Sequence, residues 1–264
     1  MPKMVVQGAS EGSAEFWSAF ALGRAIGLPG QREPEASQRH VLVGDVATAR
    51  GALKTIDKNV KRSRVVAIDI EGDLRPTGRL SLIQIGLEDE SVFLFDVQEC
   101  PALLHANSGA SGLSLRSLLC GPAVKILHDC RNDARALKGQ FDITMTRVWD
   151  TQVSHAILED KDPTVHHAGL NVILQKYAGA YNGDKTLVRH GPGVWEQRPL
   201  PPLLLRYAAQ DVQHLIKVYR KMHRMIVQKN LLERSMTATA LCCRAGGETP
   251  QPSQGRLSQR EAVR

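Results

Sequence analysis

The chain has 264 residues, enough for one large domain with a full hydrophobic core or for two small domains. Hydrophobic residues make up 42% of it and charged residues 23%, an ordinary soluble composition that excludes the fibrous and membrane-protein classes. Lys and Arg number 34 against 27 Asp and Glu, and the resulting net charge of +7 mildly favours a polyanionic partner such as a nucleic acid.

Cysteine usage and the lack of long apolar runs indicate the compartment. The five cysteines form an odd set without a CxxC spacing, which is typical of free thiols in a reducing compartment. The adjacent Cys242 and Cys243 could ligate a metal ion, but no spacing typical of a zinc site lies near them. No secretory segment opens the chain and no run reaches transmembrane length, so we expect a cytoplasmic or nuclear protein that does not contact membranes.

The first elements are predicted after a polar beginning. Residues 1–39 mix Gly, Ser and Glu around one apolar patch and are expected to form an N-terminal extension. Residues 41–43 then predict a short strand, and Asp45 is a plausible cap for a helix over 46–56. A basic cluster comes before the next strand: Lys54, Lys58, Lys61, Arg62 and Arg64.

The central part of the chain predicts an α/β domain over residues 40–235. Three strand-like runs joined by short polar turns predict an antiparallel meander, and after it helices alternate with a buried strand. The strands are expected at 65–71, 80–85, 92–97 and 124–128, and the helices at 113–119, 133–138, 150–158, 170–177 and, as one long helix, 203–232. Residues 236–264 end in Gly, Pro, Ser, Gln and charge, and we expect a disordered tail.

Two carboxylates stand at the end of the first strand of the meander. Asp69 and Glu71 are two residues apart, so in a strand their side chains share one face. The two carboxylates repel each other and resist burial unless a cation lies between them. Mg²⁺ and Mn²⁺ take oxygen ligands of this kind. The pair alone is also compatible with a structural calcium site.

Two later segments supply further acids. Asp133 falls in the first turn of a predicted helix, where it could simply interact with the helix dipole. Tyr207 and Asp211 are four residues apart on a predicted helix and so share a face, which an ordinary half-buried Tyr–Asp pair would also do.

The combination resembles a known superfamily. The sequences DIE at 69–71, HDCRND at 128–133 and YAAQD at 207–211 are similar, in order and separation, to the three exonuclease motifs of the DEDD superfamily of 3′–5′ exonucleases. The Tyr four residues before the last Asp is typical of the DEDDy branch, which includes RNase D.

A closer similarity is to the exonuclease 3′–5′ domain-containing proteins related to RNase D and Egalitarian. It depends on the HDCRxD form of the second motif, on FDI…WDTQ at 141–152 and on GLN…YAGAYN…K…WEQRPL at 169–200. The resemblance covers about residues 40–235. It implies a ribonuclease H-like fold, in which helices flank a mixed sheet with the acid-bearing strand at its centre.

The resemblance also implies a mechanism with two Mg²⁺ or Mn²⁺ ions. In this family pattern Asp69 bridges both ions, Glu71 and Asp211 ligate the first, and Asp133 holds the second largely through water. Tyr207 would orient the attacking water, since an ordinary tyrosine pKa near 10 makes it a poor base at pH 7.

Other polar positions are weaker candidates for substrate contacts. Gln84, beside Asp69 in the meander, could support the site or the terminal sugar, or be structural. Lys185 and Arg189 lie in a Gly-rich connection and could reach backbone phosphates, or be solvated loop charges. Trp195 is expected to pack on the last helix. A basic ridge is expected on that helix beyond Asp211, at Lys217, Arg220, Lys221 and Arg224.

Two classes of function compete. The first is a metal-dependent 3′–5′ exonuclease acting on single-stranded ends, RNA favoured over DNA, with a protein partner contributing to substrate choice. The second is a catalytically silent RNA-binding scaffold that keeps the fold, as some relatives of Egalitarian do. Scaffolds of that type usually lose acids, and this chain keeps all four together with Tyr207, which favours the enzyme.

Overall fold

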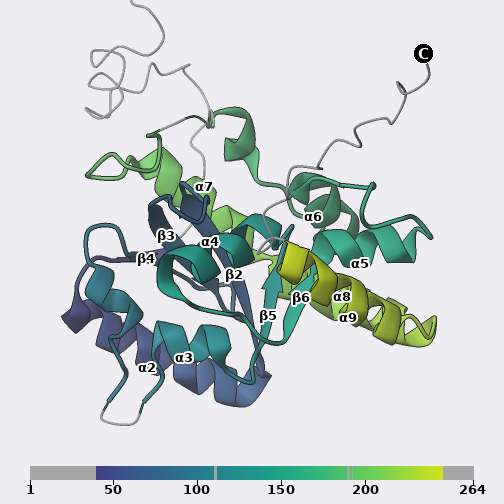
Figure 1. The fold of residues 1–264 in the computed structure, drawn as a ribbon, viewed down its shortest axis with the longest axis horizontal. Helices are drawn as coiled ribbons and strands as arrows, with labels where there is room; N and C mark the ends of the chain where they lie inside the picture. Colours follow the sequence, from purple (N-terminus) through teal and green to yellow (C-terminus); the bar gives the residue numbers. More distant parts are fainter. Residues whose placement is uncertain (1–39, 110–111, 189–190, 192, 246–264) are drawn as a thin grey trace, which may run out of the picture.

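A computed structural model describes residues 40–109, 112–188, 191 and 193–245 (Figure 1). The expected N-terminal extension at 1–39, the end of the expected tail at 246–264, and Arg189 lie outside the described residues. Within the described ranges, every helix is too short or too polar to cross a membrane.

The described strands form a six-stranded mixed sheet in the order β1-β4-β3-β2-β5-β6 (Figure 1). Strands β2, β3 and β4 pair antiparallel as the predicted meander, whereas β1 lies parallel to β4, and β2, β5 and β6 run parallel to one another. The α/β prediction is confirmed, and the acid-bearing strand β2 lies inside the sheet between β3 and β5. The strands are β1 (His40–Val43), β2 (Val65–Gly72), β3 (Leu80–Gly86), β4 (Val92–Asp96), β5 (Val124–Leu127) and β6 (Val148–Asp150).

Helices α2 to α7 begin within two residues of the positions that the sequence indicates. The Asp45 side chain accepts a hydrogen bond from the Thr48 amide and caps α2, and the Asp150 side chain caps α5 in the same way. The helices are α2 (Val46–Ser63), α3 (Leu115–Cys120), α4 (Arg131–Phe141), α5 (Thr151–Leu158), α6 (Leu170–Ala178), α7 (Pro202–Gln213), α8 (Leu215–Gln228) and α9 (Leu232–Ala245), with short 3₁₀ helices η1 (Pro101–Leu104) and η2 (Gly183–Thr186). Helix α2 is longer than predicted, and it includes most of the basic cluster.

Each face of the sheet carries its own hydrophobic core. One core includes Ile68 and Ile70 of β2 and packs against α2, α3 and α4. The other includes Ala67 of β2 and packs against α6, α7 and α8. Because side chains alternate along a strand, Asp69 lies in phase with Ala67 and therefore on the face that α7 covers.

The predicted long helix at 203–232 is wrong, since the chain bends at His214 and forms α7 and α8 instead. The break has a packing reason. Helix α7 lies on β2, β3 and β4, whereas α8 packs mainly on α5 and α6, and one straight helix cannot reach both surfaces. The bend lets α7 carry Tyr207 and Asp211 over β2, β3 and β4, while α8 contacts β2 and β5 and packs on α5 and α6.

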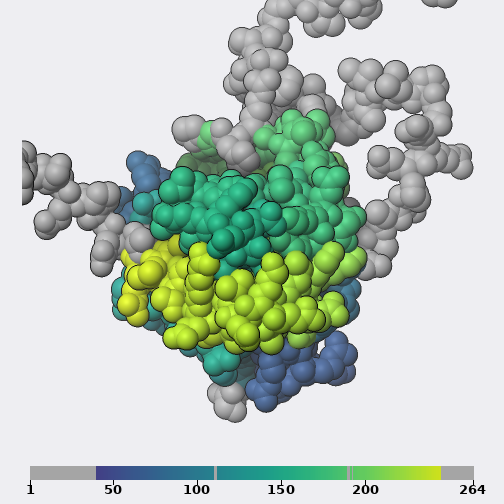
Figure 2. Space-filling model, turned by 90° about the vertical axis from the view of Figure 1, so that its right-hand side faces the viewer, coloured from purple at the N-terminus to yellow at the C-terminus, as the bar shows by residue number. Residues whose placement is uncertain are grey.

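The C-terminal helix α9 continues past the boundary expected at residue 235. It packs against α4, α5 and β6, and it buries the side chains of Ser235 and Thr239. Figure 2 shows the yellow C-terminal helices forming one continuous surface beside the teal residues of the middle of the chain. The folded unit of the described chain therefore extends to Ala245.

Candidate active site

The end of β2 presents the first two acids. The strand register shifts between Glu71 and Gly72, and Gly72 has a φ of +133°, a conformation that favours glycine. A Cβ atom at position 72 would lie 2.6 Å from the amide nitrogen of Ser81, so the close approach of β3 also requires glycine. This bulge ends the strand directly after Asp69 and Glu71.

The third acid lies in the first turn of α4. Before this helix, Asp129 has a φ of +61°, and the turn is held by the carboxylate of Asp150, which accepts from the amides of Asp129 at 3.2 Å and Cys130 at 2.8 Å. Asp133 follows one turn later and is only 5% exposed. Asp150, whose side chain caps α5, therefore also holds the turn that places Asp133.

Helix α7 carries the remaining two residues on its buried face. Tyr207 and Asp211 are both 3% exposed, and the small residues Ala208 and Ala209 let the helix approach the sheet. Trp195 packs with its ring centroid 6.0 Å from that of Tyr207, as expected for a residue that supports α7.

The structure brings these side chains to one place. Ligand oxygens of Asp69, Glu71 and Asp211 all lie within 4.8 Å of one another. Asp133 and Tyr207 face the same open cavity of about 370 Å³. Its lining consists of Asp69, Ile70, Glu71, Leu74, His128, Asp129, Asn132, Asp133, Leu170, Lys185, Tyr207, Asp211 and Leu215.

The acids are electrostatically strained without a cation. Burial and the neighbouring Asp211 raise the pKa of Asp69 to about 7. Burial and the charge of Asp69 likewise raise the pKa values of Glu71 and Asp133 well above the ordinary carboxyl range. Clustered oxygen donors whose negative charge exceeds the positive charge beside them fit hard divalent cations such as Mg²⁺ or Mn²⁺.

Lys185 is the cation of the described chain that reaches the acids. Its Nζ atom donates to Oδ2 of Asp211 at 2.8 Å and to the Tyr207 hydroxyl at 3.0 Å, and it lies 4.7 Å from the centre of the Tyr207 ring. Burial and then the charge of Asp211 raise the pKa of Tyr207, so its hydroxyl stays protonated at neutral pH. Tyr207 is therefore suited to hydrogen bonding and not to proton abstraction.

Sequence reasoning missed Asn182. Its side chain is fully buried, and its Nδ2 atom donates to Oδ1 of Asp211 at 2.6 Å. Asn182 ends the YAGAYN stretch of the resemblance, but it gives no periodic signal, and only the fold reveals its contact with Asp211, 29 positions away along the chain.

Other predicted positions lie elsewhere. Gln84 is opposite Asp69 in the β2–β3 pair but is fully buried, absent from the cavity lining, and its amide has no hydrogen-bond partner among the described residues. Its role stays a prediction, as does that of Arg189. The basic ridge of α8 lines a separate cavity, where Arg220 pairs with Glu88 at 2.9 Å.

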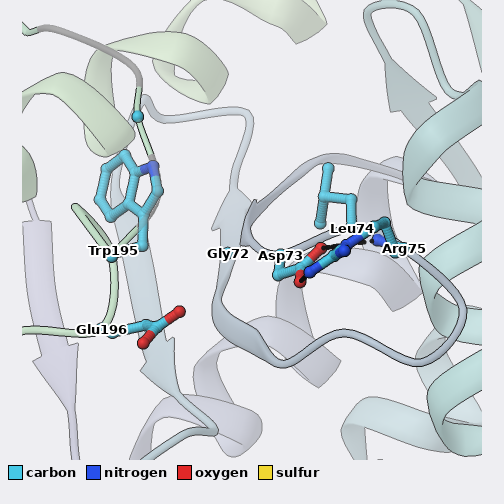
Figure 3. Close-up of a pocket in the computed structure, with 8 residues that line it drawn as sticks. Gly72, Asp73, Leu74, Arg75, Trp195 and Glu196 are labelled. Atoms are coloured by element: carbon cyan, nitrogen blue, oxygen red, sulfur yellow. Dashed lines mark hydrogen bonds and ion pairs between the residues drawn. The ribbon is translucent and has the colours of Figure 1, made fainter.

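A second cavity, of about 450 Å³, adjoins the first beyond the bulge. Leu74 lines both cavities. In Figure 3, Trp195 and Glu196 lie across this space from Asp73 and Arg75, which form an ion pair. The acids therefore line one cavity and a second cavity adjoins it at Leu74.

The fold agrees with comparisons to known proteins. A family model described as 3′-5′ exonuclease matches residues 46–227, well over half of the chain. The chain belongs to this 3′–5′ exonuclease family. Human piRNA biogenesis protein EXD1 is 26% identical over 170 residues, which cover 60% of this chain and 32% of that protein. Ribonuclease D of Haemophilus influenzae is 32% identical over 177 residues, which cover 66% of this chain and 40% of that protein.

Solved structures show the same architecture. The Trypanosoma brucei RNase D complex with RNA U12 has a TM-score of 0.62 at 24% identity, covering 83% of this chain and 75% of that one. Escherichia coli RNase D has a TM-score of 0.61 at 18% identity, and the match covers 80% of this chain and 51% of that one. These likenesses confirm the ribonuclease H-like fold. The chain spans about a third of the length of the human relative, so the match concerns the exonuclease domain.

Proposed function

We propose that this chain is a two-metal-ion 3′–5′ exonuclease that hydrolyses phosphodiester bonds at the 3′ ends of single-stranded nucleic acid, with RNA favoured over DNA. The observation that carries the proposal is the meeting of Asp69, Glu71 and Asp211 within 4.8 Å, with Asp133 and Tyr207 lining the same cavity. Family membership supports the direction of cleavage and the use of divalent metal ions.

The acids would hold Mg²⁺ or Mn²⁺, with Asp69 shared between two ions, Glu71 and Asp211 on the first, and Asp133 on the second. Bound ions of this kind supply Lewis-acid stabilisation of the phosphate and lower the pKa of a bound water. The Tyr207 hydroxyl, protonated at neutral pH, would orient the attacking water by a hydrogen bond. Lys185 would contribute positive charge to the phosphate.

Several observations support the choice of RNA. One structural neighbour is an RNase D in complex with RNA U12, and relatives of this chain include Ribonuclease D and piRNA biogenesis proteins. The hollow beside the acids has room for a terminal nucleotide. The five free cysteines favour a reducing compartment, cytoplasm or nucleus, and a protein partner would contribute to the choice of substrate.

The test is an exonuclease assay with 5′-labelled single-stranded RNA and DNA of one sequence in Mg²⁺ or Mn²⁺. We expect stepwise shortening from the 3′ end, faster on RNA, and its loss in Asp69→Ala and Asp211→Asn. Shortening that persists in both variants would contradict the proposed site. Tight RNA binding without shortening would instead favour the scaffold function.

A further inference from the structure

The two oxygens of the Asp211 carboxylate have different partners from one short segment. Asn182 donates to Oδ1 at 2.6 Å, and Lys185 donates to Oδ2 at 2.8 Å. Both partners belong to the turn of η2, which Asn182 caps. Asp184 in the same turn is buried and contacts Arg206 at 3.3 Å, so the turn is attached to α7 by several bonds.

Asn182 is built into the protein as a fixed partner. Its Nδ2 atom donates to Asp211 and also to the backbone carbonyl of Tyr207, at 3.1 Å, while its Oδ1 atom accepts from the Asp184 amide at 3.0 Å. The Asn171 side chain holds its backbone from both sides, accepting from the Asn182 amide at 2.9 Å and donating to the Asn182 carbonyl at 3.0 Å. A fully buried amide in this network has one available orientation.

Lys185, in contrast to Asn182, is a partly exposed and flexible partner of Asp211. Its side chain is 26% exposed, and it ends in a single charge on a flexible stem. Its ammonium group meets the Asp211 oxygen that Asn182 leaves open, and the Tyr207 hydroxyl as well. A divalent ion ligated by that oxygen would compete with the ammonium group for the same lone pairs.

We propose that Asn182 is a positioning residue that orients Asp211 for its metal ion, and that Lys185 is a displaceable cation that holds the same carboxylate until the metal ion arrives. Asn182 keeps Oδ1 occupied, which leaves Oδ2, the oxygen that Lys185 contacts, for the metal ion. Lys185, once displaced, is free to turn toward the substrate phosphate. This inference rests on the proposed function, because it requires that Asp211 is a metal ligand.

The two residues are therefore expected to change metal affinity in opposite directions. Loss of a hydrogen bond that orients a metal ligand typically costs 10- to 100-fold in affinity, so we expect Asn182→Ala to weaken Mn²⁺ binding by about tenfold or more. Lys185→Met keeps the length of the stem and removes the competing charge, so Mn²⁺ binding is expected to tighten several-fold. A general loss of folding cannot produce this pair of opposite effects.

The test measures free Mn²⁺ by electron paramagnetic resonance during titration of the full chain without nucleic acid. Lys176→Met is the matched control, because Lys176 pairs with Glu159 on the outside of the molecule, and removal of its charge should leave Mn²⁺ affinity unchanged. Asn171→Ala is the second variant. It loosens Asn182 while keeping its amide, and we expect an intermediate loss, which keeps the inference testable if Asn182→Ala does not fold.

The outcomes distinguish a failure of the proposed function from a failure of the roles proposed for Asn182 and Lys185. If the wild-type protein binds no Mn²⁺, the proposed function fails. If the wild type binds Mn²⁺ but neither Asn182→Ala nor Asn171→Ala weakens the binding, Asn182 does not position Asp211. If Lys185→Met weakens Mn²⁺ binding or leaves it unchanged, Lys185 is not a competing cation.

Discussion

The clustered acids of the site are costly to the protein when no metal ion is bound. In the metal-free protein the pKa of Asp69 is raised from 3.8 to about 7. Folding therefore takes up a proton between these pH values, and the folded state loses stability as pH rises through the same window. The free energy of unfolding that is lost in this pH window is the electrostatic cost of burying the Asp69 charge beside the other acids.

This cost predicts that Asp69→Asn stabilises the metal-free protein. At pH 8 we expect a gain of about 2 kcal/mol in the free energy of unfolding, because the variant carries no charge at this position. The gain should shrink toward zero as the pH falls to about 3, below the pKa of the aspartate in both states. Urea unfolding in the presence of a chelator measures it. Addition of Mg²⁺ should stabilise the wild type more than the variant, and a gain that is equal at all pH values would contradict the account.

Tyr207 is expected to act by position. In Tyr207→Phe the ring still packs on Trp195 but the hydroxyl is gone, so we expect kcat for RNA hydrolysis to fall by about 100-fold while Mn²⁺ affinity stays nearly unchanged. Single-turnover kinetics and a Mn²⁺ titration of one preparation measure both quantities. An unaltered rate would remove the water-orienting role, and a large loss of Mn²⁺ binding would show that the hydroxyl supports the metal site instead.

A site residue can be predicted from the sequence when a local pattern marks it, and not when only contacts between distant segments place it in the site. Asp69 and Glu71 stand out because strand alternation places both on one face. Asp133 and Asp211 each look like ordinary helix acids, and only the resemblance to a family connects them with β2. Asn182 and His128 fall within motifs that carry the resemblance, but their places in the site come from contacts between distant segments.

At the scale of elements, the connection between α6 and α7 is held to the sheet by one buried ion pair. Arg198 donates to both carboxylate oxygens of Asp96, at 2.7 and 2.6 Å, and also to the Ser81 hydroxyl at 2.8 Å. Its remaining donor atom reaches the carbonyl of Trp195 at 2.8 Å. This pair fixes the end of the segment that carries Lys185 and Trp195 to the edge of the cavity.

We therefore expect Arg198→Ala to destabilise the protein by about 3 kcal/mol, because it leaves the buried Asp96 charge without its partner. The loss is measured by urea unfolding. Arg234→Ala is a matched control, since Arg234 forms an exposed pair with Asp160 and should change stability by less than about 1 kcal/mol. Similar small effects of both substitutions would show that the Arg198 pair does not hold the connection.

Elements were predictable where local pattern decides them. The meander, the Asp45 and Asp150 caps and the alternation of helices with strands follow from periodicity and capping chemistry. The bend at His214 does not, because helical periodicity continues through it and the packing partners of α7 and α8 decide where the chain turns. Strand β6, with three residues, is too short to show a period.

At the scale of the whole molecule, the site forms where the sheet, α4, α7 and the η2 turn meet. Each contributes what its own geometry allows: a strand end offers two acids on one face, a helix start offers one, and a buried helix face offers the Tyr–Asp pair. The first and last acids, Asp69 and Asp211, are more than a hundred positions apart along the chain, so the closed site depends on the complete fold.

The central claim is that these acids hold metal ions that act on the 3′-terminal phosphodiester. The most direct measurement is single-turnover cleavage of RNA in which sulfur replaces one non-bridging oxygen of that linkage. Mg²⁺ prefers oxygen ligands and Mn²⁺ accepts sulfur more readily, so we predict a rate at least about tenfold lower for one phosphorothioate isomer in Mg²⁺, and its recovery in Mn²⁺. Equal rates for all substrates, or a loss that Mn²⁺ does not restore, would contradict direct contact between the metal ions and the scissile phosphate.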